Sequence, residues 1–153
     1  MSSAAYQIIT AMQARLATMT TGNGYNYNMG SNLYLGKQQI NETQLDSGPQ
    51  VQLYLTDDIP QDSDRHVDPM MIELGMVVIG ASFTGSTNPL LMASNMLEDI
   101  KSAALVVGGE TLGGKTLDVG YAGSVIEYPD AGGDAVVVTC NFTTLYEETY
   151  GTP

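Results

Sequence analysis

The longest apolar segment of the chain, Met70 to Phe83, most constrains what this sequence can fold into. It is apolar at both odd and even positions, as expected of a central strand that is covered on both faces. Gly75 and Gly80 interrupt the segment, and we expect bends or bulges there. A central strand needs a neighbour on each side, so the chain must build a sheet around this segment.

Three other segments alternate between apolar and polar residues, which is the pattern of strands with one buried face. They are Val51 to Thr56, Leu117 to Val125, and a C-terminal segment that ends near Tyr146. In the last one, the residues that share a face are Val136, Val138, Cys140, Phe142 and Tyr146. These segments supply the partner strands that the central strand requires.

Two segments have the three- and four-residue apolar spacing of amphipathic helices. The first begins at a serine cap, Ser2 or Ser3, and continues to about Met19. The second begins with Asn88 as the N-cap and Pro89 as the first helical residue, and continues to about Leu105. The order helix, strands, helix, strands predicts one α+β domain over residues 1–153, with a mainly antiparallel sheet flanked by two principal helices.

The second helix has two neighbouring apolar rows. One row is the predicted core stripe Leu90, Ala93, Leu97, Ile100 and Ala104. The other consists of Met92, Met96 and Ala103. A wide core face accounts for both rows, and the alternative is that Met92 and Met96 form contacts between subunits.

The charge of the chain excludes ordinary nucleic-acid binding. The sequence has 5 basic and 17 acidic side chains and a net charge of −12. Nucleic-acid-binding proteins are basic because their cations displace the counterions of phosphate. Only 14% of the residues are charged, whereas tyrosine and methionine, which protein interfaces favour, are numerous. This composition indicates assembly with other protein chains.

The acidic residues are densest in one stretch, which we expect to be a loop. Its aspartates are Asp57, Asp58, Asp62, Asp64 and Asp68. Carboxylates suit Ca²⁺, but the stretch lacks the glycine and the closing Glu of an EF-hand loop. We therefore expect a loop that faces a partner or solvent, and a cation site is the alternative. One His and one Cys leave no set for a His/Cys metal site or a Cys–His pair, so we expect no metal and no catalytic residue.

Gly109 to Thr116 matches the phosphate-loop pattern G-x-x-x-x-G-K-T. In a true phosphate loop, Lys115 would contact the terminal phosphates and Thr116 would hold magnesium. Such a loop follows a strand and begins a helix, whereas the residues after Thr116 are strand-like. We therefore expect a turn, no cofactor and no enzymatic activity. A small nucleotide-binding protein is the alternative.

The sequence has no membrane or secretion signal that we recognise. No apolar run reaches the roughly 20 residues of a membrane helix. The N-terminus has no basic region before its apolar residues, as a signal peptide would. Cys140 is the single cysteine and cannot form an internal disulfide, so we expect a reducing cytoplasm.

The order and character of the segments resemble the tail terminator, or tail completion, proteins of long-tailed bacteriophages. The resemblance lies in a helix from Tyr6 to Leu16, the turn Asn23-Gly24-Tyr25, the two strand segments before the second helix, the Pro-started helix Pro89–Lys101, and the segment Tyr128–Tyr146. It implies a small α+β domain that is not an enzyme. It further implies a ring, sixfold in this family, that caps the completed tail tube and ends its growth.

The resemblance also implies the partners of such a ring. They are further copies of the chain, the tail tube protein, and a head–tail connector or stopper protein. DNA would pass through an acidic lumen without specific binding, with no membrane involved. The aspartate stretch from Asp57 to Asp68 would be the candidate to line that lumen or to face a partner. The protein would lie in the tail or neck of the virion after assembly in the host cytoplasm. Another neck protein, such as a connector or stopper, is the alternative, and the aspartate stretch and phosphate-loop pattern depart from the family.

Overall fold

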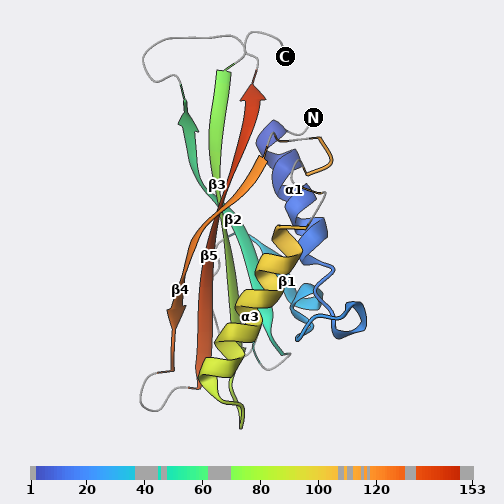
Figure 1. The fold of residues 1–153 in the computed structure, drawn as a ribbon, viewed down its shortest axis with the longest axis vertical. Helices are drawn as coiled ribbons and strands as arrows, with labels where there is room; N and C mark the ends of the chain where they lie inside the picture. Colours follow the sequence, from blue (N-terminus) through green and yellow to red (C-terminus); the bar gives the residue numbers. More distant parts are fainter. Residues whose placement is uncertain are drawn as a thin grey trace.

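The computed structural model describes residues 3–36, 45, 48–61, 70–106, 109, 112–114, 116, 118–129 and 134–148. Two helices, α1 (Ala4–Leu16) and α3 (Pro89–Ala104), pack on one face of a five-stranded sheet (Figure 1). Two short 3-10 helices, Thr21–Asn23 and Met29–Asn32, connect α1 to the sheet. The predicted α+β fold with two principal helices is confirmed.

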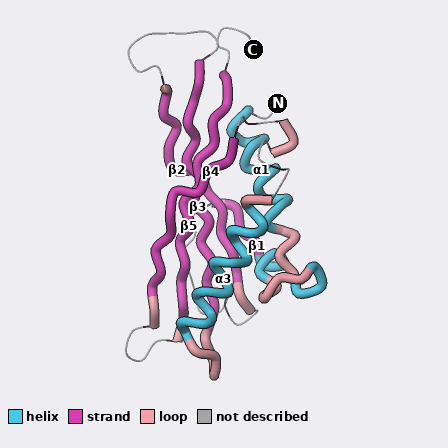
Figure 2. The backbone as a smooth tube through the Cα atoms, viewed as in Figure 1, coloured by secondary structure: helices cyan, strands magenta, loops and turns pink. Residues whose placement is uncertain are grey.

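The strands are β1 (Leu33–Leu35), β2 (Gln50–Pro60), β3 (Met70–Phe83), β4 (Asp118–Glu127) and β5 (Ala135–Glu148). Their order in the sheet is β1-β2-β3-β5-β4 (Figure 2). β1 runs parallel to β2, and all other neighbours are antiparallel. The predicted central strand β3 is therefore central. β4 forms one lateral edge of the sheet, while β1 and the second half of β2 form the other.

The alternation in β5 shows how the sheet meets its helices. Val136, Val138, Cys140, Phe142 and Tyr146 are all buried, and the residues between them are mostly half-buried. The period-two prediction is therefore confirmed. Burying a side chain as large as Phe142 contributes about 1.5–3 kcal/mol. We call the side of the sheet toward α1 and α3 the helix face, and the opposite side the far face.

Both helices begin at the caps that the sequence predicts. Ser3 Oγ accepts a hydrogen bond from Tyr6 N at 3.1 Å, and Asn88 Oδ1 accepts one from Leu90 N at 2.9 Å. Caps of this kind contribute roughly 1 kcal/mol each. Within the described residues, no helix is long and apolar enough to cross a membrane.

Gly75 and Gly80 form no bulge in β3, which pairs with β5 in unbroken register through both positions, and they allow neighbouring groups to come close. A Cβ atom at Gly80 would lie 3.0 Å from Ile100 Cδ1, so this glycine lets α3 approach the sheet. A Cβ atom at Gly75 would lie 2.6 Å from Thr56 Oγ1. The irregularity at this level is a bulge at Thr56 in the partner strand β2.

The two described helices cover only one face of β3, although the sequence predicts cover on both. On the far face, Val77 and Ala81 are 5% and 1% exposed, yet neither belongs to the core cluster beneath the helices. Gln50 and Gln52 of β2, which share the far face, are also buried, at 0% and 1% exposure. Apolar residues at both parities of β3 thus indicate a central strand that is buried on both faces.

Polar contacts fix α3 in place over the sheet. Asp99 Oδ1 accepts hydrogen bonds from Asn26 N and Asn26 Nδ2, both at 2.9 Å, and its Oδ2 accepts one from Tyr27 N at 3.0 Å. Arg15 of α1 donates from Nη1 to Ala104 O at 3.0 Å and from Nη2 to Gly109 O. The first bond satisfies a carbonyl group at the end of α3, and the second satisfies one in the segment that follows the helix. The helix is thus held at its middle and at its C-terminal end.

Candidate functional site

The aspartate stretch is partly strand. Asp57 and Asp58 belong to β2, which continues to Pro60, so the predicted loop is wrong for these two residues. The cause is β3, which is long enough to pair with them. Asp57 lies opposite Gly75 on the far face, and Asp58 lies opposite the core residue Leu74 on the helix face. The predicted candidates Asp62, Asp64 and Asp68 lie outside the described residues.

Carboxylates from four strands gather on the far face at the end of the sheet where β2 terminates. We call them the acidic end: Asp57, Glu73, Asp118 and Glu147. Asp57, Asp118 and Glu147 are exposed, and Glu73 is half-buried. Side chains on adjacent strands of one face lie within reach of each other, and like charges there are destabilising. The acidic end therefore does not serve the stability of the fold.

No described cation offsets this charge. The basic residues whose placement is described, Arg15 and Lys101, both lie on helices, on the other side of the sheet. Among the described residues, no group of three or more His, Cys, Asp or Glu side chains could hold a metal ion. The described part of the far face is thus a negatively charged surface without a basic side chain.

The methionines of α3 lie in the core of the protein itself. Met92 and Met96 are 5% and 0% exposed and belong to the core cluster. The structure supports the wide core face and leaves neither side chain at the surface for the predicted subunit contact. Leu90, predicted in the core stripe, is instead 64% exposed, because it lies in the first turn of α3 at the rim of a groove.

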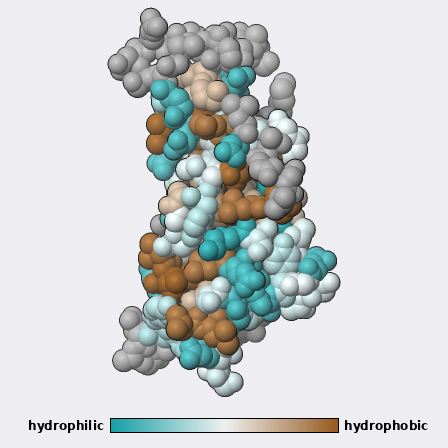
Figure 3. Space-filling view, viewed as in Figure 1, coloured by the Kyte–Doolittle hydropathy of each residue, from teal (hydrophilic) through white to brown (hydrophobic). Residues whose placement is uncertain are grey.

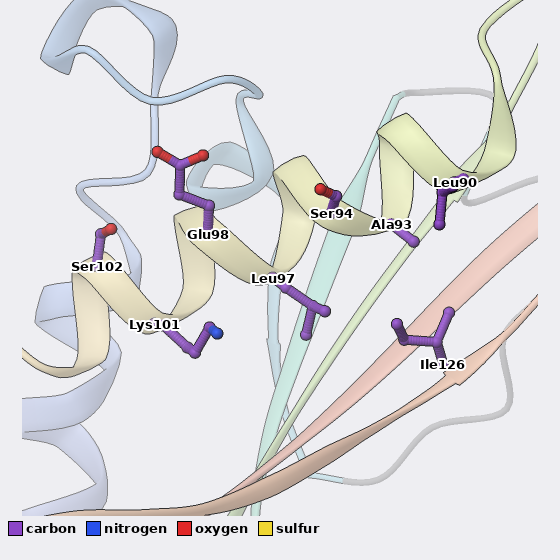
Figure 4. Close-up of a pocket in the computed structure, with 8 residues that line it drawn as sticks. All are labelled: Leu90, Ala93, Ser94, Leu97, Glu98, Lys101, Ser102 and Ile126. Atoms are coloured by element: carbon purple, nitrogen blue, oxygen red, sulfur yellow. The ribbon is translucent and has the colours of Figure 1, made fainter.

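A groove of about 470 Å³ separates α3 from the edge strand β4 (Figure 4). The apolar residues that line it are Leu90, Ala93, Leu97 and Ile126. In Figure 4, Leu97 and Lys101 project from the helix toward the strands, whereas Glu98 and Ser102 project away from them. The groove therefore has an apolar part and a polar part, to which Ser94, Glu98, Lys101 and Ser102 contribute, and Lys101 is the residue of the polar part that points toward the strands.

Lys101 is bound to the edge strand through an aromatic ring. Its Nζ lies 5.3 Å from the centroid of the Tyr121 ring, and that ring lies 5.7 Å from the ring of Phe142. A cation–π contact of this kind contributes about 0.5–1 kcal/mol at an exposed site. Within the described part of the chain, no carboxylate pairs with Lys101. The ammonium group is thus positioned at this edge, where it can attract a negatively charged partner.

Exposed apolar side chains lie along both lateral edges of the sheet. On one side we define the β4 edge as Leu90, Tyr121, Val125 and Tyr128. On the other we define the β2 edge as Leu35, Leu55 and Ile59. Figure 3 shows hydrophobic side chains gathered over β4 and the N-terminal part of α3. Apolar residues concentrated in this way typically mark contact surfaces.

The backbone is unpaired at both edges, within the residues that the structure describes. β4 pairs only with β5, and beyond Leu53 β2 pairs only with β3. Each edge strand has a bulge, at Thr56 in β2 and at Ala122 in β4. Bulges and edge charges hinder uncontrolled pairing between sheets. The two edges are thus contact surfaces at which the bulges hinder backbone pairing with the sheet of another molecule.

The phosphate-loop pattern lies between α3 and β4. A helix precedes it and a strand follows it, which is the reverse of the order that a phosphate loop requires. Leu112 to Gly114 form a turn, as predicted, and Lys115 lies outside the described residues.

Cys140 is a core residue of β5. Its side chain is fully buried, and burial raises the pKa of the thiol, although Ser124 and Lys101 lower it to a smaller extent. A thiol that stays protonated is a poor nucleophile. Cys140 therefore lies on the buried face of β5, with the residues that the sequence predicts to share its face.

No protein-family model matches this chain, and no curated protein matches it either. Its function is therefore inferred from the edges, the groove and the acidic end.

Proposed function

We propose that this chain is the structural subunit of a ring at the end of a bacteriophage tail tube, where it ends tube growth and joins the tube to the head connector. The observation that carries the proposal is the presence of two unlike apolar edges on one sheet. When a surface binds a different surface on the next copy, the copies assemble head to tail and close into a ring if the rotation permits. The two edges suit such a contact.

The far face supplies the wall of the DNA channel in this proposal. Its acidic end repels phosphate groups, and its described part has no cation that would bind them. DNA therefore moves past the ring during packaging and release without becoming bound. The tail tube protein and the connector or stopper protein contact the two ends of the ring, in the neck of the virion.

Ring formation is expected to depend on salt. Each copy has a net charge of −12, so free copies repel each other at low ionic strength. Raising the salt from about 0.01 M to about 1 M shortens the Debye length from roughly 30 Å to roughly 3 Å and should shift the protein from monomers to rings. Sedimentation velocity and electron microscopy of the purified protein measure this shift.

Two single substitutions of equal charge provide the control. Val125→Asp places a carboxylate on the β4 edge and is expected to abolish the rings. Tyr6→Asp changes an equally exposed residue of α1 outside both edges and should leave them intact. A protein that stays monomeric at every salt concentration, with and without tail tubes, would refute the proposed ring.

A further inference from the structure

We infer that the groove between α3 and β4 receives the β2 edge of a second copy, with Lys101 of one copy beside Asp58 of the next. The inference rests on the proposed function, because it specifies the contact that builds the ring. The strand directions, the level of the exposed residues and the charges of the two edges each support it.

The strand directions of the two edges fit each other. Three antiparallel pairings separate β2 from β4, so these strands run in opposite directions within one copy. Rotation about an axis parallel to the strands preserves strand direction. In a ring around such an axis, β4 of one copy therefore lies antiparallel to β2 of the next.

The exposed residues of the two edges lie at the same level of the sheet. Leu55 is opposite Met76, Met76 is opposite Phe142, and Phe142 is opposite Tyr121. One row thus runs across the sheet from exposed Leu55 on the β2 edge to exposed Tyr121 on the β4 edge. Because rotation within a closed ring does not change the level, Leu55 of one copy arrives beside Tyr121 of the next.

The side chains on the helix face of the two edges are complementary. Leu55 and Asp58 both point to the helix face, because they lie opposite the core residues Met76 and Leu74. On the same face of β4, Lys101 lies over the Tyr121 ring, at the end of the groove that is nearest to Tyr121. Leu55 therefore lies beside Tyr121 at the Lys101 end of the groove. The exposed Asp58 carboxylate lies at the level of Val119, two residues from Tyr121, and meets the Lys101 ammonium group there. Opposite charges at such a rim fix the register of a contact.

The bulges restrict the contact to side chains. Thr56 and Ala122 interrupt β2 and β4 at this same level, and Pro60 has no N–H group to donate. A continuous backbone ladder between copies is therefore not formed. Binding depends instead on the leucine and the charge pair, which keeps free copies from pairing indiscriminately.

Charge exchange at constant net charge tests this contact. The double variant Asp58→Lys/Lys101→Glu exchanges the two members of the pair and is expected to associate as tightly as the unmodified protein. The matched variant Asp57→Lys/Lys101→Glu has the same net charge, but residue 57 points to the far face, so its lysine does not reach the groove. Its dissociation constant should be about tenfold higher.

Sedimentation velocity measures the association of the two double variants at protein concentrations up to the millimolar range. The salt concentration is about 0.15 M, where the Debye length is roughly 8 Å. Circular dichroism checks that each variant is folded. If the two double variants associate equally, or if the Asp57 variant associates more tightly, the groove contact is wrong. The proposed ring is not contradicted by either result. If neither the variants nor the unmodified protein associates at any concentration or salt, with or without tail tubes, the ring and the groove contact both fail.

Discussion

Replacing Asp99 with alanine is expected to lower the free energy of unfolding by about 3 kcal/mol. Asp99 is only 2% exposed, and its carboxylate accepts three hydrogen bonds from Asn26 and Tyr27. The substitution leaves two backbone N–H groups without an acceptor, and an unsatisfied buried donor costs about 1–3 kcal/mol. The turn around Tyr27 would then no longer be held against α3, the helix that forms one wall of the groove.

Two further variants make this result specific. Glu98→Ala removes the exposed carboxylate next to Asp99 on the same helix and should change the stability by no more than about 0.5 kcal/mol. Asp99→Asn should fall between them, because the amide keeps one acceptor oxygen but turns an NH₂ group toward a backbone N–H. Urea unfolding followed by circular dichroism measures all three. If Asp99→Ala unfolds at the same urea concentration as Glu98→Ala, the carboxylate does not hold the turn.

Reversing the charge of the acidic end is expected to slow DNA release from the virion at least about tenfold. In the variant Asp57→Lys/Glu73→Lys/Glu147→Lys, lysines replace carboxylates on the far face of every copy in the ring. Lysines attract phosphates and release their counterions, so DNA would bind a wall that it otherwise passes. The delay should shrink as salt is raised, because salt weakens this attraction.

A neutral variant separates the loss of repulsion from the gain of attraction. Asp57→Asn/Glu73→Gln/Glu147→Gln has nearly the same side-chain shapes and adds no cation, so it should assemble and release DNA at close to the normal rate. Release is followed by the fluorescence of a DNA-binding dye after ejection is triggered. Normal release by the lysine variant, from virions with normally assembled tails, would show that the acidic end does not face DNA.

Much of the fold could be predicted because its periodic patterns are strong. The inward residues of β5 repeat without interruption, and Asn88 with Pro89 marks the start of α3 at the residue where it begins. The burial of Met92 and Met96 in the core also follows from the apolar width of that helix. Such patterns report which residues share a face of one element.

The edges could not be predicted, because one bulge changes which face the following residues occupy. The sequence of β4 suggests that Val125 shares a face with Tyr121. The bulge at Ala122 shifts the register, so that Ile126 faces α3 and Val125 lies on the far face. A single-residue shift of this kind leaves no periodic signal.

The acidic end could not be predicted as a unit, since its carboxylates come from four strands. The alternation of β5 does place Glu147 on the polar side of its strand. The strand order and register, however, are needed to bring it near Glu73 and Asp57. Asp57 itself suggests a loop because aspartate is rare in strands, and pairing with β3 overrides that preference.

Electron microscopy of phage particles assembled without this protein tests the tail-terminating role most directly. We expect tails that are longer than normal and carry no heads, because nothing would stop growth of the tube or offer a surface to the connector. Tails of normal length joined to heads would contradict the proposed role.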